Sequence, residues 1–224
     1  MTSRVTMRLH LIRHGQTPSN LTHALDTDEP GAPLTPEGER QARAVGRVFA
    51  NRPLAAVYAS HLTRARQTAA QVARPHGLEV QLRQGLREIL AGDLEMRTDP
   101  ASVQQYLGTM IAWAAGDLDR VMPGGEDGHR TLERYDRVVA EVAGTGVPEA
   151  ALVSHGAIIR LWAVTRGANL DPAEAAERWL DNTGVVTLEG TPGDWQVTAW
   201  QDEVVPHASA VPGDGPGGRP VPLT

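Results

Sequence analysis

Apolar and polar residues alternate along the chain in a pattern that predicts strands and helices in turn. Short apolar runs, typical of buried strands, are followed by segments with the three- to four-residue period of an amphipathic helix. The predicted strands are 5–12, 54–60, 78–82, 149–155, 183–190 and 194–200. The predicted helices are 35–50, 62–73, 100–116, 126–143 and 157–166. This order favours a three-layer α/β/α sandwich with a mostly parallel central sheet.

Local signals mark where several of these elements begin and end. Thr35 is the predicted N-cap of the first helix and Pro36 suits its first turn. Ser60 is the predicted N-cap of the second helix. The last two strands are separated by a Gly-Thr-Pro-Gly turn at 190–193, which predicts a tight connection between them.

The composition of the chain changes near residue 203. Residues 203–224 are dense in Pro and Gly and have no apolar period, so we predict a C-terminal tail. Residues 1–202 then form one catalytic domain, in which 89–130 is expected as a small cap or insertion.

Composition and charge narrow the class of protein. The 224 residues include no cysteine, which removes disulfides and thiolate chemistry and suits the cytoplasm. No apolar run has the length of a membrane span, and we expect no signal peptide. The net charge is −6, so neither nucleic acid nor a membrane is an expected partner. All 21 basic residues are arginine, so arginine or histidine must hold any anion.

Three predicted strands deliver histidine and arginine to one edge of the sheet. Arg13 and His14 end the first strand, Arg64 lies just past the second, and His155 ends a third. Arginine forks match phosphate oxygens, and a neutral imidazole is a nucleophile toward phosphorus. Flanking guanidinium groups are expected to keep it neutral. Glycine after each histidine permits close backbone approach, and a nearby helix N-terminus would add amide donors. The pattern predicts phosphoryl transfer.

A series of motifs adds a family resemblance. In chain order they are "LIRHGQT" followed by Asn20, "LTPEGERQA", "YASHLTRARQTA", "LREILAGDLE", "MPGGED" and "LVSHG". Over roughly residues 7–200 they resemble the motifs of the histidine phosphatase superfamily, in the branch with cofactor-dependent phosphoglycerate mutases and fructose-2,6-bisphosphatase. The resemblance implies a phosphoglycerate mutase-like fold.

The resemblance also implies roles for individual residues. His14 is the nucleophile that becomes phosphohistidine, and Glu88 is the acid that protonates the leaving oxygen and then activates water. Its first step requires Glu88 to be protonated. The implied catalytic residues are His14, Glu88 and His155. The implied phosphate-binding residues are Arg13, Asn20, Arg64 and His155. The chemistry requires no metal and no cofactor.

Some assignments near this site have alternatives. Asp93 and Glu95 are the substitutes if Glu88 is not the acid. Arg66 is expected at the surface, because it faces away from Arg64 on the same helix. A structural role for Glu126 in its loop, such as capping the next helix, is weighed against a catalytic one.

Two further residues are candidates for contact with substrate. His61 is expected beside the pocket, and Trp113 is the tryptophan expected to reach substrate. The remaining histidines, including His10, have no spacing that suggests a metal cage, and we interpret them as surface or supporting residues.

The residues after Glu88 separate two activities. They read "ILAGDLEM", with Met96 where the family has glycine, and 89–120 contains five acids against two arginines. Phosphoglycerate mutases have a basic insertion there. We therefore predict a metal-independent phosphatase for a small phosphate monoester. The alternatives are a cofactor-dependent phosphoglycerate mutase-type enzyme and a phosphate-binding pseudoenzyme. A homodimer is the candidate assembly.

Overall fold

A six-stranded sheet forms the centre of the computed structural model, which we describe over residues 6–173 and 178–201. The strand order is β3-β2-β4-β1-β5-β6. In chain order the strands are β1 (Met7–Arg13), β2 (Ala56–Ala59), β3 (Val80–Leu82), β4 (Glu149–Ser154), β5 (Val185–Thr191) and β6 (Asp194–Trp200). The predicted tail 203–224 lies outside the described residues.

The four strands β3, β2, β4 and β1 are mutually parallel, whereas β5 and β6 are antiparallel to their neighbours. Parallel neighbours need a long crossover, but β5 and β6 are joined only by Pro192 and Gly193. Gly193 has φ of +91°, which glycine adopts without strain. The sheet is therefore mostly parallel as predicted, with an antiparallel edge that the predicted turn produces.

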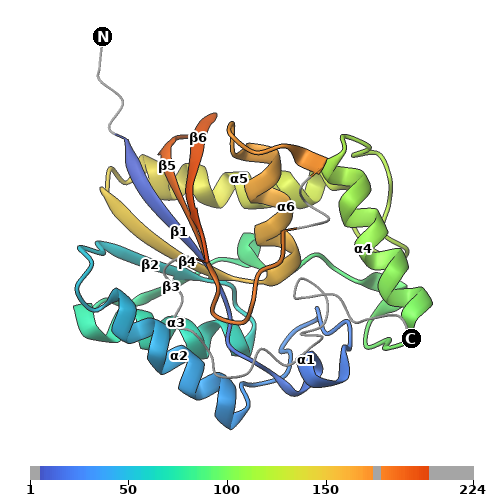
Figure 1. Ribbon diagram of the computed structural model, residues 1–224, viewed down its shortest axis with the longest axis horizontal. Helices are drawn as coiled ribbons and strands as arrows, with labels where there is room; N and C mark the ends of the chain where they lie inside the picture. The colour runs from blue at the N-terminus through green and yellow to red at the C-terminus, as the bar shows by residue number, and fades with distance from the viewer. Residues whose placement is uncertain (1–5, 174–177, 202–224) are drawn as a thin grey trace.

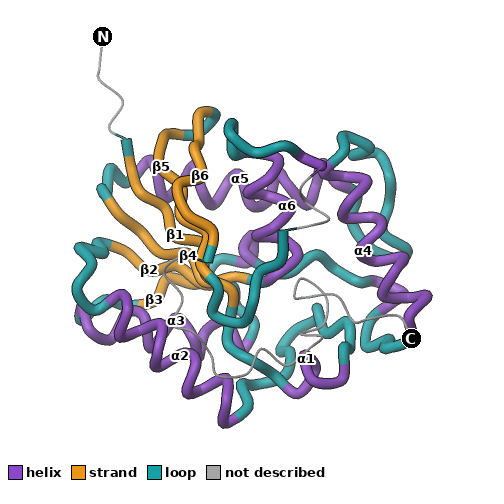
Figure 2. Tube along the Cα trace, viewed as in Figure 1, coloured by secondary structure: helices purple, strands orange, loops and turns teal. Residues whose placement is uncertain are grey.

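Helices cover both faces of the sheet (Figures 1 and 2). The helices are α1 (Pro18–Thr22), α2 (Pro36–Phe49), α3 (Thr63–Ala73), α4 (Pro100–Ala114), α5 (Gly128–Gly144) and α6 (Gly156–Arg166). Single 3₁₀ turns form η1 (Arg74–His76), η2 (Gln84–Leu86) and η3 (Gly92–Leu94). One apolar core joins the sheet to α2 and α3, and a second joins it to α4, α5 and α6. This confirms the three-layer prediction.

Of the two N-caps predicted from the sequence, Thr35 is confirmed and Ser60 is wrong. Thr35 caps α2, since its side chain accepts a hydrogen bond from the Gly38 N–H at 3.0 Å. Ser60 does not cap α3, because that helix begins at Thr63 and Leu62 is its cap residue. Ser60 lies too early in the chain, and its fully buried hydroxyl is used elsewhere.

The carboxyl ends of β1, β2 and β4 lie under two long connections. One is 14–35, which contains α1, and the other is 84–99, which contains η2 and η3. The two are joined where the Leu25 N–H donates to the Arg97 carbonyl and the Met96 N–H donates to the Leu25 carbonyl, both at 3.0 Å. These connections position the residues of the site.

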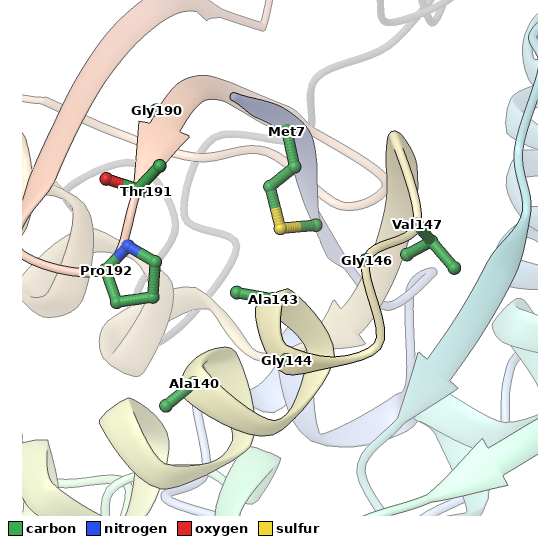
Figure 3. A pocket seen from close by; sticks show the side chains of 9 residues that line it. All are labelled: Met7, Ala140, Ala143, Gly144, Gly146, Val147, Gly190, Thr191 and Pro192. Atoms are coloured by element: carbon green, nitrogen blue, oxygen red, sulfur yellow. The ribbon is translucent and has the colours of Figure 1, made fainter. Parts of the chain in front are cut away.

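A hollow lies at the opposite end of β1, between the end of α5 and the β5–β6 turn (Figure 3). It is lined by Met7, by Ala140, Ala143 and Gly144 of α5, by Gly146 and Val147 beyond that helix, and by Gly190, Thr191 and Pro192; none of these residues is titratable. It therefore offers no charged or titratable side chain, and its polar side chain is the Thr191 hydroxyl. Within the described residues, no helix has the length and apolar character needed to cross a bilayer.

Candidate active site

A small cavity lies at the carboxyl edge of the sheet, between 14–35 and the residues after β3. Its water-accessible volume is about 20 Å³, which holds about one water molecule. The charged or titratable lining residues are His14, Asp26, Arg64 and Glu88. The other polar lining residues are Thr17, Ser19, Asn20, Thr27 and Tyr106. The structure thus brings four of the predicted site residues, His14, Asn20, Arg64 and Glu88, into one cavity.

The neighbours of His14 determine which of its ring nitrogens carries the proton. Nδ1 lies 2.7 Å from the Gly15 carbonyl oxygen, which only accepts, so Nδ1 carries the hydrogen. Nε2 lies 3.1 Å from Arg64 Nε, which only donates, so Nε2 carries no hydrogen and its lone pair accepts from Arg64. Burial lowers the pKa of His14 well below its usual value, and the charges of Arg64 and Arg13 lower it further. At neutral pH His14 is therefore an uncharged imidazole with its lone pair at Nε2.

The backbone around His14 is fixed on several sides. Its N–H donates to the Ser154 carbonyl, and its own carbonyl accepts from the Thr183 N–H and the Asn182 side chain. A Cβ on Gly15 would lie 2.5 Å from the Gly38 carbonyl oxygen. A glycine is thus required at position 15, because the backbone of α2 lies against it. The predicted close backbone approach is confirmed, and the group that approaches is the protein's own backbone at Gly38.

Arg64 is held from the loop that follows α1. Its Nη2 donates to the Asp26 carbonyl at 2.7 Å, and its Nη1 lies 3.5 Å from the Asp26 carboxylate. A Cβ on Gly31 would lie 2.3 Å from Nη1, and Gly31 has φ of +68°. Arg64 is 3% exposed, whereas Arg66 is at the surface as predicted. The loop thereby fixes the guanidinium against His14.

His155 and Arg13 lie behind His14 and do not line the cavity. The ring centroids of His14 and His155 are 5.1 Å apart, and His155 Nε2 lies 2.8 Å from the Ser60 hydroxyl. Burial lowers the pKa of His155 well below its usual value, with a further contribution from Arg64. Arg13 is buried and donates to the Leu180 carbonyl at 2.7 Å.

Asn20 has a local structural role at the start of α1. Its side-chain oxygen accepts from the Thr17 N–H at 2.9 Å and from the Thr17 hydroxyl at 3.1 Å. The Thr17 hydroxyl in turn accepts from the Asn20 N–H, which completes a capping box. Asn20 therefore shapes the cavity wall as well as lining it.

Glu88 occupies the N-terminus of α6. Its carboxylate is buried and accepts the N–H groups of Ala157, Ile158 and Ile89 at 2.9–3.1 Å. The first N–H groups of a helix lack partners within it, and the helix dipole favours negative charge there. The expectation that this terminus offers its amides to phosphate is therefore wrong for Ala157 and Ile158, which donate to Glu88.

Arg134 of α5 fixes the backbone around Glu88. It donates to the carbonyls of Gly85, Arg87 and Glu88 at 2.7–2.9 Å. Glu126 binds Arg134 and Arg87 at 3.0 and 2.7 Å. This confirms a structural role for Glu126. The capping role is wrong, because the N-cap of α5 is its neighbour Asp127.

The alternatives to Glu88 do not line the cavity. Glu95 accepts from the Thr27 N–H and hydroxyl at 2.8 and 2.5 Å, and from the Asp28 N–H at 3.1 Å. Asp93 is exposed. Of the three acids, Glu88 alone faces the cavity.

Three expectations concerned other aromatic or imidazole residues. Trp113 is buried, with its indole N–H donating to the Arg120 carbonyl, so α4 contributes Tyr106 to the cavity instead. His61 is absent from the cavity wall and lies 3.2 Å from the Glu29 carboxylate. His10 is fully buried, which excludes the surface position and leaves the supporting role.

Sequence reasoning missed Asp26, Tyr106 and Arg134. Asp26 belongs to the acidic run "DTDE", which was a detectable signal, but its position against Arg64 depends on the loop conformation. No group of three or more His, Asp or Glu side chains within 6–173 and 178–201 is arranged to hold a metal ion.

A neutral buried imidazole opposed by guanidinium, at the carboxyl edge of an α/β sheet, is suited to phosphoryl transfer. The chain belongs to the histidine phosphatase superfamily (branch 1), which residues 9–203 match. It is therefore an enzyme of the phosphatase and mutase type, as the sequence predicts.

Relatives of the chain come from several bacteria. The PE-PGRS family protein PE_PGRS11 of Mycobacterium tuberculosis is 32% identical over 219 residues. That match covers 90% of this chain, which spans only 37% of the longer relative. GpmB of Salmonella choleraesuis, described as a probable phosphoglycerate mutase, is 29% identical over 208 residues, covering 91% of this chain and 94% of GpmB.

Solved structures share the fold over nearly the whole chain. A mycobacterial glucosyl-3-phosphoglycerate phosphatase is similar with a TM-score of 0.74 and 27% identity, covering 87% of this chain and 98% of that one. The α-ribazole phosphatase of Shigella flexneri has a TM-score of 0.71 at 24% identity, covering 91% of this chain and 100% of that one, and shows the fold alone.

Proposed function

We propose that this protein is a metal-independent phosphatase that hydrolyses a small phosphate monoester through a phosphohistidine on His14. The observation that carries the proposal is the tautomer of His14. Its Nδ1–H is bound to the Gly15 carbonyl, so the Nε2 lone pair faces the cavity next to Arg64. A neutral nitrogen that carries no hydrogen is the nucleophile that phosphoryl transfer requires.

In the first step, His14 Nε2 attacks phosphorus and the bond from phosphorus to the ester oxygen breaks. Arg64 Nε, which donates to Nε2 in the free site, then donates to a phosphoryl oxygen instead. Asn20 lines the cavity, whereas Arg13 and His155 lie outside its wall, and we assign all three to the support of the phosphoryl group. The Gly15 carbonyl stabilises the positive charge that the ring gains as the N–P bond forms.

Glu88 is the general acid of the first step and the general base of the second. In the first step Glu88, which lines the cavity, donates the proton that the leaving oxygen requires. In the second step water attacks phosphorus, Glu88 takes the proton of that water, and the N–P electron pair returns to Nε2. Phosphate leaves and the site is restored.

Hydrolysis of p-nitrophenyl phosphate with chelator present tests this function. We expect turnover by the native chain and a loss of at least about 10⁴-fold in kcat/KM for His14→Ala. An exposed histidine provides the control, since His129→Ala removes an imidazole that is 61% exposed. Turnover that persists in His14→Ala would contradict the proposed nucleophile, and a requirement for a divalent metal would contradict the metal-independent reaction.

The mutase alternative rests on the likeness to GpmB, which covers most of both chains. It differs in the acceptor, because a bound phosphoglycerate rather than water takes the phosphoryl group. Phosphate exchange between 3-phosphoglycerate and its 2-isomer, primed with the bisphosphate, would favour it over hydrolysis. A protein that binds phosphate but turns over neither compound would be a pseudoenzyme. The domain limits, a homodimer and a cytoplasmic location stay predictions.

A further inference from the structure

The charged side chains that line the cavity include more carboxylates than cations. Arg64 is the only positively charged side chain among the described residues that line the cavity, and His14 is neutral. Two carboxylates, Asp26 and Glu88, line it as well. Arg64 is the cation available at the cavity wall to one phosphate dianion, and Arg13 is buried outside that wall. The rest of the substrate therefore meets carboxylates and no further cation.

The loop after α1 carries acids and no arginine. Between Arg13 and Arg40 the chain contains five acidic residues and no arginine or lysine. Asp26 is within this segment, and its side chain is only 8% exposed. The facing connection contains two arginines, and neither lines the cavity: Arg87 donates to Glu126 at 2.7 Å and Arg97 donates to Asp99 at 2.8 Å. The wall beyond the phosphate position is thus negative.

Hydroxyl groups on the wall present their acceptor side. Ser19 donates its hydrogen to the Asp26 carboxylate at 2.6 Å, and Tyr106 donates to the Ile89 carbonyl at 2.9 Å. Thr27 donates to Glu95 at 2.5 Å, and its oxygen also accepts from the Ala91 N–H at 2.9 Å. A hydroxyl whose hydrogen is already used can only accept from a ligand. The wall therefore accepts hydrogen bonds from substrate and repels acceptors.

We propose that the substrate's alcohol half is a hydrogen-bond donor without negative charge, a polyol or amino-alcohol monophosphate, and that Asp26 excludes phosphorylated carboxylates and bisphosphates. This inference rests on the proposed phosphatase function. A carboxylate on the substrate would lie unpaired next to Asp26, whereas a hydroxyl or ammonium group would donate to it.

A matched pair of compounds tests this selectivity in the full-length protein. Racemic glycerol 3-phosphate and racemic 3-phosphoglycerate have the same three-carbon skeleton and differ by a hydroxymethyl group against a carboxylate. We expect kcat/KM to be on the order of 100-fold higher for glycerol 3-phosphate. Their inhibition constants against p-nitrophenyl phosphate should differ by a similar factor, so binding is measured even if turnover is slow.

The variant Asp26→Asn assigns the selectivity to one carboxylate. Asparagine keeps the acceptor for Ser19 and the backbone carbonyl for Arg64, so we expect the 100-fold ratio to fall to roughly 10-fold. Asp119→Asn makes the same change of charge at a side chain that is 99% exposed and should keep the ratio.

Failure of this inference differs from failure of the proposed function. Absence of p-nitrophenyl phosphate turnover in the native chain would overturn the phosphatase. Turnover of that ester with equal or better use of 3-phosphoglycerate, with no competition by glycerol 3-phosphate, or with a ratio unchanged in Asp26→Asn, would overturn the inference alone. The native comparison stands even if the variant does not fold.

Discussion

His10 and His14 are four residues apart in the same part of the chain and both are buried, yet their surroundings differ. His10 lies inside β1, where its Nε2 is 3.0 Å from the Glu149 carboxylate of β4 and its Nδ1 is 3.0 Å from the Thr187 hydroxyl of β5. His14 lies just beyond β1, where its Nε2 faces the Arg64 guanidinium. Both ring nitrogens of His10 are committed to neighbouring strands.

The difference shows that burial alone does not decide what a histidine does. The Glu149 carboxylate accepts a hydrogen bond from His10 Nε2, and Nδ1 binds Thr187, so His10 links β1 to both neighbouring strands. An arginine partner leaves the lone pair of His14 available, because the guanidinium can donate to a phosphoryl oxygen instead. The end of the strand matters, since only there can a helix and loops approach the ring.

Removal of the guanidinium that opposes His14 should have the largest effect. We expect Arg64→Ala to lower kcat/KM for p-nitrophenyl phosphate by about 10³-fold, because the transferring phosphoryl group loses a buried cationic donor. Arg66→Ala removes an exposed guanidinium from the same helix and should change kcat/KM less than twofold. Equal losses of kcat/KM in Arg64→Ala and Arg66→Ala would show that the contact of Arg64 with His14 does not explain why His14 is reactive.

Removal of the His10 ring should affect stability and spare activity. His10→Ala leaves the Glu149 carboxylate buried, with only Arg8 Nη1 at 3.7 Å, and opens a cavity beside Phe49. We expect the free energy of unfolding to fall by about 3 kcal/mol in urea titrations, with kcat within a few-fold of native at 20 °C. A loss of activity as large as that of His14→Ala, in protein shown to be folded, would place His10 in the catalytic machinery.

The comparison also indicates what the sequence could predict. Strand ends are marked by apolar runs, so the meeting of His14 and Arg64 at one edge followed from the order of the elements. The flanking arginines were expected to keep His14 neutral, and they do contribute, but burial is the larger cause. Burial depends on the loop after α1, which no periodicity describes.

Features that depend on distant contacts were not predictable. The loop containing Asp26 is held by Glu95, whose carboxylate binds Thr27 from 68 residues away. α1 spans only five residues, too short for a hydrophobic period, and rests on the capping box of Thr17 and Asn20. Trp113 was expected at the substrate because of its place in the sequence, but its helix turns it into the core.

The smallest expected effect concerns the pH dependence of stability. The folded-state pKa values of His14 and His155 lie well below the usual 6.5, so the folded protein keeps both rings neutral where the unfolded chain becomes protonated. The stability that the two neutral rings contribute is therefore fully present above about pH 7.5. It is lost as the pH falls through 6.5 toward the folded-state pKa values. Each of the two rings contributes a slope of up to about 1.4 kcal/mol per pH unit.

The slope between pH 6 and 5 separates this mechanism from a general loss of packing. His155→Asn should reduce the slope of the unfolding free energy by up to about 1.4 kcal/mol per pH unit, whatever it does to stability at pH 7.5. His129→Asn changes an exposed ring and should leave the slope at the native value. The slope measures how many more protons the unfolded chain binds than the folded protein, and lost contacts do not change it. An unchanged slope in His155→Asn would therefore mean that the His155 ring of the native protein is charged in the folded state.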